Sequence, residues 1–214
     1  MKLPEKFKPR IVMTVLGVFV CSMAVGLFKC SLFGVDPFQC FAMGSWGKLM
    51  PNYSYGFYYM AISILFLIVD LFLDKHYIGI ATFINLFLTG YVVDFSVSLI
   101  NRFLAEPTMV QRVLMLAAGI LIICFGSSLY MTADLGVSVY DAIAIVIGNK
   151  TPIPFRFARI ICDVICVSIG TICVLAGAVG GVLPGIGTII TAFFMGPLID
   201  FFNRKFSEPF LARR

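Results

Sequence analysis

The sequence predicts an all-α polytopic membrane protein of six transmembrane helices, arranged as two inverted three-helix repeats with a short half-helix after the first span of each. Three observations predict this fold class. Of the 214 residues, 60% are hydrophobic and 13% are charged, whereas about 25% of a soluble domain is charged. Six apolar stretches have the length of a membrane span, about 18 residues or more. The two halves of the chain also repeat each other. A water-soluble enzyme and a disordered chain are excluded.

The six apolar stretches occupy most of the chain. They cover residues 11–31, 56–73, 78–100, 113–132, 157–178 and 185–202. The first lacks a clear small-residue cleavage site, so we expect an uncleaved helix rather than a signal peptide. With six spans, 12 of the 16 Lys and Arg residues lie on the side of both termini and 4 on the other side. This excess predicts cytoplasmic N- and C-termini in the bacterial cytoplasmic membrane.

An internal repeat divides the chain. The matched segments are 79–95 with 185–201 and, more weakly, 33–39 with 135–141. In the first pair, eight of seventeen positions are identical. The second pair is offset by 102 residues, and the same offset aligns Gly17 and Ala24 with Gly119 and Gly126. These small residues are seven apart, so each pair predicts a narrow helix face where another helix can approach closely.

Each half, 1–106 and 107–214, therefore holds three predicted spans. An odd number of spans per half turns the second copy upside down in the membrane. Inverted repeats of this kind are typical of secondary transporters, whose substrate sites lie near the middle of the membrane where the repeats meet. The alternative is a duplication that builds a stable helical bundle without a transport function.

A helix start follows the first span of each half. Its residues are Gly34, Asp36, Pro37 and Gln39 in the first half and Gly136, Ser138 and Asp141 in the second. Asp and Ser are strong N-caps, Pro suits the first helical turn, and an acid or amide three residues after the cap completes a capping box. The glycine two residues before each cap permits a sharp turn. The helices that follow, 37–46 and 139–148, would be about 15 Å long, half a bilayer.

We expect these half-helices to enter from opposite sides and to frame a substrate site. Each N-terminus carries about +0.5 charge and free N–H groups, which suits an anionic or carboxylate-bearing substrate. The alternative is a pair of amphipathic helices lying flat at the two membrane surfaces. Trp46 and Tyr140 favour the surface position, whereas the apolar run 142–147 favours burial.

Three aspartates inside the predicted spans are candidates for gating or proton coupling, because an ionisable group in lipid is costly. Asp94 and Asp200 are repeat equivalents, and Asp163 lies in the fifth span. Arg204 follows Asp200 by four residues and Arg159 precedes Asp163 by four, so helix-face ion pairs are the alternative role.

Two further polar residues are predicted to line the central passage. Asn85 lies in the middle of its span without a local partner, so it must bond to another helix or to substrate, and it aligns with Thr191.

Asp70 lies within four residues of its helix end, where we expect water to solvate it.

The sequence predicts no cofactor, metal or nucleic-acid partner. Cys162, Cys166 and Cys173 share one helix face, and packing explains them better than a soft-metal site. The cations lie at helix ends and form no basic stripe. Catalytic motifs such as His-Glu-x-x-His and Gly-x-Ser-x-Gly are absent from the sequence, which argues against an intramembrane enzyme.

The repeated motifs also carry a family resemblance. They are Gly34-Val35-Asp36-Pro37-Phe38, Asp134-Leu135-Gly136-Val137-Ser138, and Gly185-Ile186-Gly187-Thr188 with Gly196-Pro197-Leu198-Ile199-Asp200-Phe201. With these motifs, most of the chain resembles the YczE/YyaS/YitT family of bacterial integral membrane proteins. The resemblance implies a transporter and supplies no substrate. In the first repeat, Ala81 and Tyr91 replace the glycine and proline of the last motif.

The sequence thus predicts a small-molecule secondary transporter or permease whose partners are the lipid bilayer and an unidentified substrate, with a homo-oligomer left open. Two alternatives come from other classes. One is a substrate-binding membrane subunit of a multi-component, vitamin-type importer, which fits the chain's size and span count, although an inverted repeat is not expected of it. The other is a non-transporting accessory protein that stabilises a partner.

Overall fold

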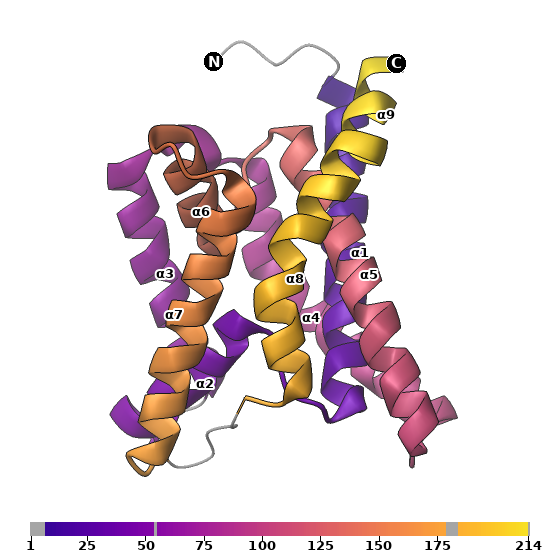
Figure 1. Ribbon diagram of the computed structural model, residues 1–214, viewed down its shortest axis with the longest axis vertical. Helices are drawn as coiled ribbons and strands as arrows, with labels where there is room; N and C mark the ends of the chain where they lie inside the picture. The colour runs from indigo at the N-terminus through magenta and orange to yellow at the C-terminus, as the bar shows by residue number, and fades with distance from the viewer. Residues whose placement is uncertain (1–6, 54, 179–183, 214) are drawn as a thin grey trace.

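The structure is a computed structural model that describes residues 7–53, 55–178 and 184–213 (Figure 1). Within these residues all regular secondary structure is helical, and turns or short loops connect the helices. The long helices are α1 (Phe7–Ser31), α3 (Tyr55–Leu73), α4 (Ile80–Phe103), α5 (Met109–Ala133), α7 (Phe155–Leu175) and α8 (Ile186–Phe202). The short elements are α2 (Pro37–Leu49), the 3-10 turn η1 (Lys75–Tyr77), α6 (Val139–Lys150), the π-helical turn η2 (Asn203–Ser207) and α9 (Glu208–Arg213).

Each predicted apolar stretch forms a long helix, and a short helix is present at both positions of the predicted half-helices, while their entry into the membrane stays a prediction. The half-helices are slightly longer than expected, with 13 residues in α2 and 12 in α6. Asp36 and Ser138 are their N-caps, as predicted. The sequence did not predict the helical structure that follows the last apolar stretch. There η2 connects α8 directly to α9, and the helical backbone continues to Arg213.

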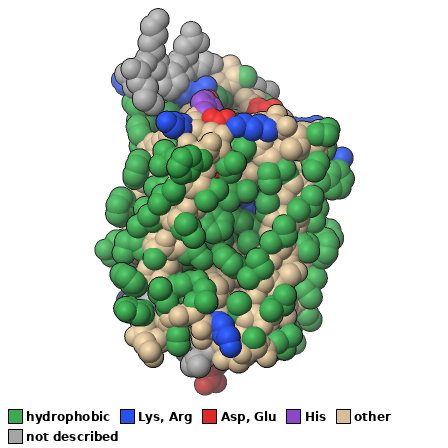
Figure 2. Space-filling model, turned by 90° about the vertical axis from the view of Figure 1, so that its left-hand side faces the viewer, with side chains coloured by type: hydrophobic (Ala, Val, Ile, Leu, Met, Phe, Trp, Pro, Cys, Tyr) green, Lys and Arg blue, Asp and Glu red, His purple; other side chains and the backbone are tan. Residues whose placement is uncertain are grey.

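Apolar helices of membrane-spanning length dominate the described chain. Helices α1, α5, α7 and the continuous run from α8 into α9 are long and apolar enough to cross a membrane. Helix α4 adds a fifth candidate, although its segments Ile80–Thr89 and Tyr91–Phe103 are inclined to each other by 43°. In α3, the apolar segment Phe57–Leu73 is shorter. Figure 2 shows hydrophobic side chains over the middle of one face, with charged side chains near its two ends. The chain is therefore a membrane protein with four to five candidate spans, and a sixth span at α3 stays a prediction.

Close contact between α1 and α5 depends on small residues. A side chain added at Gly17 would come within 2.7 Å of the carbonyl oxygen of Gly126, and one added at Gly119 within 3.5 Å of that of Ala24. The four small residues predicted to form narrow faces therefore lie against each other. Elsewhere α4 packs on α1, α2 on α7, α6 on α3 and α7, and α8 on α5 and α7.

Two similar elbows lead from the long helices α1 and α5 into the half-helices. We call residues 32–36 the first elbow and residues 134–138 the second. Leu32 and Asp134 have φ angles of 59° and 54°, and Gly34 and Gly136 have φ angles of 118° and 99°. A glycine adopts such positive φ angles without a steric penalty, so the predicted sharp turns are confirmed.

The first elbow rests on the start of α8. The N–H of Gly187 donates to the carbonyl oxygen of Phe33 at 2.9 Å. The hydroxyl of Thr188 donates to the carbonyl oxygen of Val35 at 2.6 Å, and the N–H of Val35 lies 3.1 Å from the same hydroxyl. These bonds fasten the chain before α2 to a helix that begins 150 residues later.

The second elbow rests on the start of α4 in the same way. The N–H of Ala81 donates to the carbonyl oxygen of Leu135 at 2.9 Å. The hydroxyl of Thr82 donates to the carbonyl oxygen of Val137 at 2.7 Å. Each elbow is therefore bonded to a helix from the other half of the chain, and the donor residues Ala81 and Gly187, and Thr82 and Thr188, are aligned pairs of the sequence repeat.

Candidate binding site

The N-terminal ends of α2 and α6 meet inside the protein at a stack of two aromatic rings. Phe38 and Tyr140 occupy the second position of their helices, and their ring centroids lie 4.9 Å apart with planes inclined by 23°. Both side chains are buried, each 7% exposed. The interpretation of Tyr140 as a surface residue is therefore wrong, because its ring packs on the opposite half-helix.

The start of α2 supplies one carboxylate to this region. Oδ1 of Asp36 accepts the N–H of Gln39 at 3.0 Å, and Pro37 is buried in the first turn. The half-buried Asp36 is close enough to Arg159 and Asp163 for their charges to interact. The first half of the chain therefore contributes to a charged cluster that belongs mainly to the second half.

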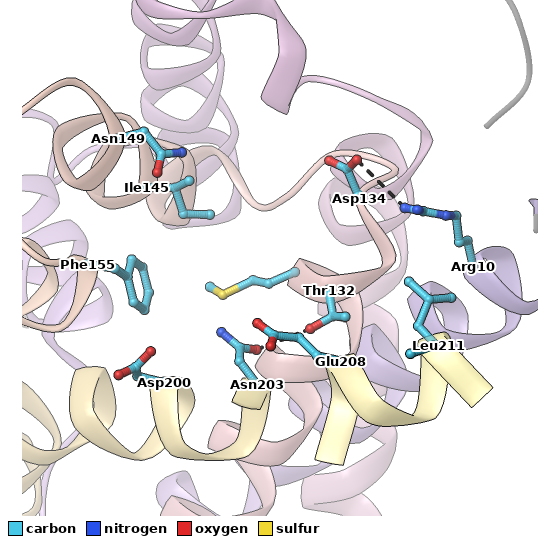
Figure 3. Close-up of a pocket in the computed structure, with 12 residues that line it drawn as sticks. Arg10, Thr132, Asp134, Ile145, Asn149, Phe155, Asp200, Asn203, Glu208 and Leu211 are labelled. Atoms are coloured by element: carbon cyan, nitrogen blue, oxygen red, sulfur yellow. Dashed lines mark hydrogen bonds and ion pairs between the residues drawn. The ribbon is translucent and has the colours of Figure 1, made fainter. Parts of the chain in front are cut away.

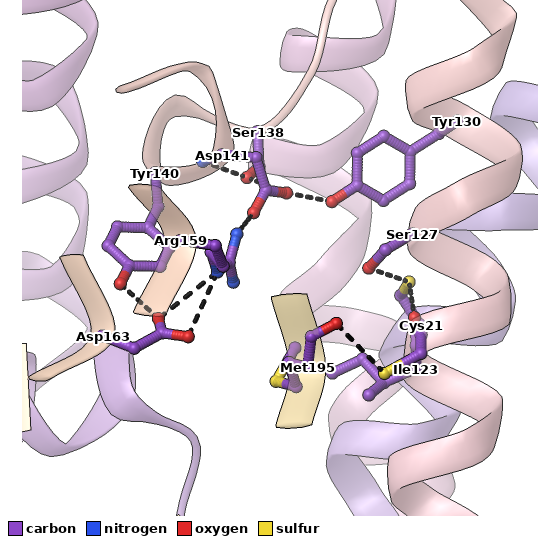
Figure 4. Close-up of polar contacts among 11 residues, drawn as sticks. Cys21, Ile123, Ser127, Tyr130, Ser138, Tyr140, Asp141, Arg159, Asp163 and Met195 are labelled. Carbon is purple, nitrogen blue, oxygen red and sulfur yellow. Dashed lines mark hydrogen bonds and ion pairs between the residues drawn. The ribbon is translucent and has the colours of Figure 1, made fainter. Parts of the chain in front are cut away.

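The start of α6 supplies a second carboxylate. Oγ of Ser138 accepts the N–H of Asp141 at 3.1 Å, as a cap should. The return bond differs from the predicted capping box, because the Asp141 carboxylate accepts the Ser138 hydroxyl at 2.7 Å. The same carboxylate also accepts the Tyr130 hydroxyl and pairs with Arg159 (Figure 4). Asp141 thus joins α5, α6 and α7.

Arg159 on α7 is the centre of the cluster. Its guanidinium pairs with Asp141 and, at 3.3 Å, with Asp163 one helical turn away, so the predicted helix-face pair is confirmed. The guanidinium also lies 4.6 Å from the centroid of the Tyr140 ring, and the Tyr140 hydroxyl donates to Asp163 at 2.5 Å. Arg159 is 5% exposed and Asp163 is fully buried. Such burial of charge costs several kcal/mol per ion and is tolerated because these partners are hydrogen-bonded.

The charges of the cluster do not cancel. Asp36, Asp141 and Asp163 supply three carboxylates, against the single guanidinium of Arg159 and two helix N-termini of about +0.5 each. With all three carboxylates ionised, the negative charges exceed the positive charges by about one. A proton or a cationic group can neutralise the remainder.

Asn85 and Thr191 hydrogen-bond within their own helices. The Thr89 hydroxyl donates to Oδ1 of Asn85 at 3.3 Å, so the expectation that Asn85 lacks a local partner is wrong. The Thr191 hydroxyl lies 3.0 Å and 2.9 Å from the carbonyl oxygens of Gly187 and Thr188. Their role in lining a passage stays a prediction.

The two repeat-equivalent aspartates have different outcomes. Asp94 lies in α4, but its side chain is outside the described part of the structure. Asp200 pairs with Arg204 at 3.1 Å, as predicted. A gating or coupling role for either residue stays a prediction.

An open cavity of about 640 Å³ lies at the end of the molecule where α1 begins and α9 ends (Figure 3). The charged residues that line it are Arg10, Asp134, Asp200 and Glu208. Phe155 also lines the cavity, and it packs against the cluster that contains the Phe38–Tyr140 stack. Cys162 and Cys166 belong to the same cluster, which agrees with a packing role. The cavity and the candidate site therefore share a wall.

Comparison with known proteins gives a family. The model of a family of unknown function, DUF6198, matches residues 8–204. The chain belongs to this family. An uncharacterized protein of Haemophilus influenzae is 26% identical to it over 178 residues, which is 83% of this chain and 75% of that protein. The uncharacterized protein YyaS of Bacillus subtilis is 20% identical over 198 residues, 92% of this DUF6198 member and 94% of YyaS, in agreement with the resemblance of the repeated motifs. No solved structure matches the chain.

The sequence did not identify three side chains of this cluster as site residues of the DUF6198 member. Arg159 is visible in the sequence only as a partner for Asp163, because Asp141 is 18 residues away and meets it through packing of α6 on α7. Tyr130 and Tyr140 lie in apolar runs, where an aromatic residue usually indicates a core or a membrane interface. The offset of 102 that aligns Phe38 with Tyr140 was the available signal.

Proposed function

We propose that this DUF6198 member is a small-molecule secondary transporter of the bacterial cytoplasmic membrane, with six spans in two inverted repeats and a substrate site at the facing N-termini of α2 and α6. The observation that carries the proposal is the stack of Phe38 on Tyr140, 4.9 Å apart. These residues are equivalent in the repeat and come from opposite halves. Paired broken helices with facing N-termini are a recurrent way to build a transport site at the middle of a membrane.

The reciprocal elbow contacts support the inverted arrangement. The first elbow bonds to the start of α8, and the second elbow bonds to the start of α4. A two-fold relation between the halves requires that each contact be returned by the equivalent residues. The α1–α5 contact follows the same rule, because Gly17 meets Gly126 while Gly119 meets Ala24. In this proposal α3 is the sixth span.

The charges favour a substrate that carries both an anionic and a cationic group. Helix N-termini and the guanidinium of Arg159 attract a carboxylate. Asp141 and Asp163 already pair with that guanidinium, however, and the cluster has about one negative charge in excess. A zwitterion leaves this excess unchanged, because its cationic group near Asp36 offsets the carboxylate that it brings, whereas a simple anion would add to the excess. A zwitterion therefore fits better than the simple anion that the sequence suggests.

The open cavity supports an entry route from the end at which α1 begins and α9 ends. Phe155 stands between the cavity and the aromatic cluster, since it contacts both. A movement of this one ring and of α6, which also lines the cavity through Ile145 and Asn149, would open the cavity toward the Phe38–Tyr140 stack.

A thermal-shift screen of the purified protein in detergent tests the proposal. Matched triplets would be compared: an α-amino acid, its α-keto acid and its decarboxylated amine. We expect the zwitterion to stabilise the fold by about 2.7 kcal/mol at one hundred times its dissociation constant. The shift should be lost in Asp36→Asn and Arg159→Lys and kept in the control Arg204→Lys, whose exposed pair lies at the surface.

Uptake of the stabilising compound into proteoliposomes then separates the alternatives. Uptake by the protein alone supports a secondary transporter. Binding without uptake, restored by an ATPase that co-purifies, would replace the proposal with a vitamin-type importer subunit. A stable complex with another membrane protein and no ligand shift would indicate an accessory protein.

A further inference from the structure

We propose that Asp70 on α3 is a proton-binding site whose carboxyl is neutral while α6 covers it and which releases its proton when α3 and α6 separate. The proposal rests on the proposed function for one point only, that this proton couples to transport. The binding site itself follows from the surroundings of the side chain.

Asp70 is buried without a hydrogen bond. It is 1% exposed, and neither of its carboxylate oxygens has a partner within the described part of the chain. An ionised carboxylate in such a place costs many times more free energy than a neutral group, so a buried, unpaired acid takes up a proton instead. The sequence expectation that water solvates Asp70 near its helix end is wrong, because the neighbouring elements cover it.

The face of α3 that carries Asp70 points at the half-helices. Ser63 and Phe66 lie seven and four residues earlier on the same face, and Ser63 is also buried. The ring of Phe66 contacts that of Phe38 edge to face, at 5.6 Å. Asp70 therefore lies one helical turn from a residue that contacts the Phe38–Tyr140 stack. A change in the charge of Asp70 would therefore alter the electrostatic environment where α3 meets the candidate site.

The described charged and titratable groups of the neighbouring elements do not bond to Asp70. On the elements that pack against α3 these groups are Cys40 and Lys48 of α2, Tyr140, Asp141 and Lys150 of α6, and Asp74, Lys75, His76 and Tyr77 around η1. None of these described groups hydrogen-bonds to the Asp70 carboxylate. Nζ of Lys150 donates instead to the carbonyl oxygen of Leu73, the last residue of α3, at 2.5 Å.

The Lys150–Leu73 bond gives the proton site a closing contact. It ties the C-terminal end of α6 to the C-terminal end of α3. When this end opens, water can reach the carboxyl, and the freed ammonium group of Lys150 would stabilise the ionised form. Protonation then favours the closed arrangement and ionisation the open one, which is the behaviour of a coupling site.

Infrared spectroscopy of the purified protein tests the protonation state. Carbon-13 labelling of aspartate carboxyl groups identifies the C=O stretch of protonated aspartic acid. At pH 7 we expect Asp70→Asn to lose part of this band and the control Asp74→Asn to keep all of it. An Asp70→Asn spectrum that loses ionised carboxylate absorption instead would overturn the proposal.

Hydrogen–deuterium exchange of α3 and α6 tests the linkage to opening. After correction for the intrinsic pH dependence of exchange, one released proton makes opening up to tenfold more frequent per pH unit in the wild type. Asp70→Asn mimics the neutral acid and should show no such rise. Equal pH dependence in both proteins would reject the switch. Neither measurement uses a substrate, so a failed transport assay would leave the proton site standing.

Discussion

The hydroxyl of Thr82 donates to the carbonyl oxygen of Val137 across 2.7 Å and fastens the first turn of α4 to the elbow before α6. The Thr82 side chain is buried and also accepts the N–H of Gly79 at 3.2 Å. Because the two partners belong to different halves of the chain, this hydroxyl is one of the groups that fasten one half to the other. Thr188 makes the equivalent bond to Val35.

Replacement of Thr82 by the isosteric Val should therefore destabilise the protein. Removal of the donor leaves the Val137 carbonyl oxygen with one partner fewer in a buried site, at a cost of about 1 kcal/mol. Unfolding in detergent, followed by circular dichroism, measures the loss. Thr171→Val is the matched control, since that hydroxyl bonds to Val167 in its own helix at 2.6 Å. Equal losses in the two variants would contradict a special role for the elbow bond.

Substitution of Gly136 by Ala should disturb the second elbow through both strain and collision. Gly136 has a φ of 99°, and an added Cβ would lie 2.5 Å from the backbone nitrogen of Gly79. Gly177→Ala provides the control, because Gly177 has a φ of 86° with nothing within 4 Å of the added atom. Both variants incur about 1 kcal/mol or more of backbone strain.

The additional loss of stability in Gly136→Ala, compared with Gly177→Ala, measures the effect of the close approach of the elbow to α4. We expect the thermal unfolding temperature and the yield of folded protein to fall further for Gly136→Ala. If Gly177→Ala lowers the unfolding temperature more than Gly136→Ala does, close docking of the elbow on α4 is not the reason for a glycine at position 136.

Loss of the Arg159 guanidinium should be severe. In Arg159→Met, Asp141 and Asp163 remain buried without their cationic partner, and we expect about 3–5 kcal/mol of destabilisation. Further replacement of both aspartates by Asn should recover most of this loss, because the uncompensated charge is then gone. Chemical denaturation of the single and triple variants gives the comparison.

Arg204→Ala is the surface control for that experiment. Its pair with Asp200 has the same four-residue spacing, but the Arg204 side chain is 73% exposed. Exposed pairs contribute less than about 1 kcal/mol. A loss in Arg159→Met as small as that in Arg204→Ala would show that the cluster does not hold α6 on α7.

Features that depend on neighbouring residues were predictable from the sequence. The caps at Asp36 and Ser138 and the pair of Arg159 with Asp163 follow from spacings of a few residues. The bond from Thr89 to Asn85 has the same four-residue spacing, so the sequence contained the signal that Asn85 has a local partner.

Features that depend on packing between helices were not predictable. Asp141 meets Arg159 only because α6 lies on α7, and Asp70 loses water only because other elements cover the end of α3. Neither helix pair leaves a local pattern in the sequence. The alignment of repeats came closest, since it pairs Phe38 with Tyr140, but an alignment gives equivalence and not contact.

The inverted arrangement makes a prediction about two equivalent lysines. Lys48 donates to the carbonyl oxygen of Ala176 at 2.7 Å at the end of α7, and Lys150 donates to that of Leu73 at 2.5 Å at the end of α3. The residues are 102 apart, and the C-terminal ends of α2 and α6 lie at opposite ends of the molecule (Figure 1).

Single cysteines at these two positions should therefore label from opposite sides of the membrane. With a membrane-impermeant maleimide on intact cells, we expect Lys48→Cys to react and Lys150→Cys to react only after permeabilisation, because the excess of Lys and Arg predicts that Lys150 is cytoplasmic. The wild-type chain with its seven native cysteines sets the background. Labelling of both positions from one side would mean that the halves are not inverted, and the two half-helices could then no longer frame a shared transport site.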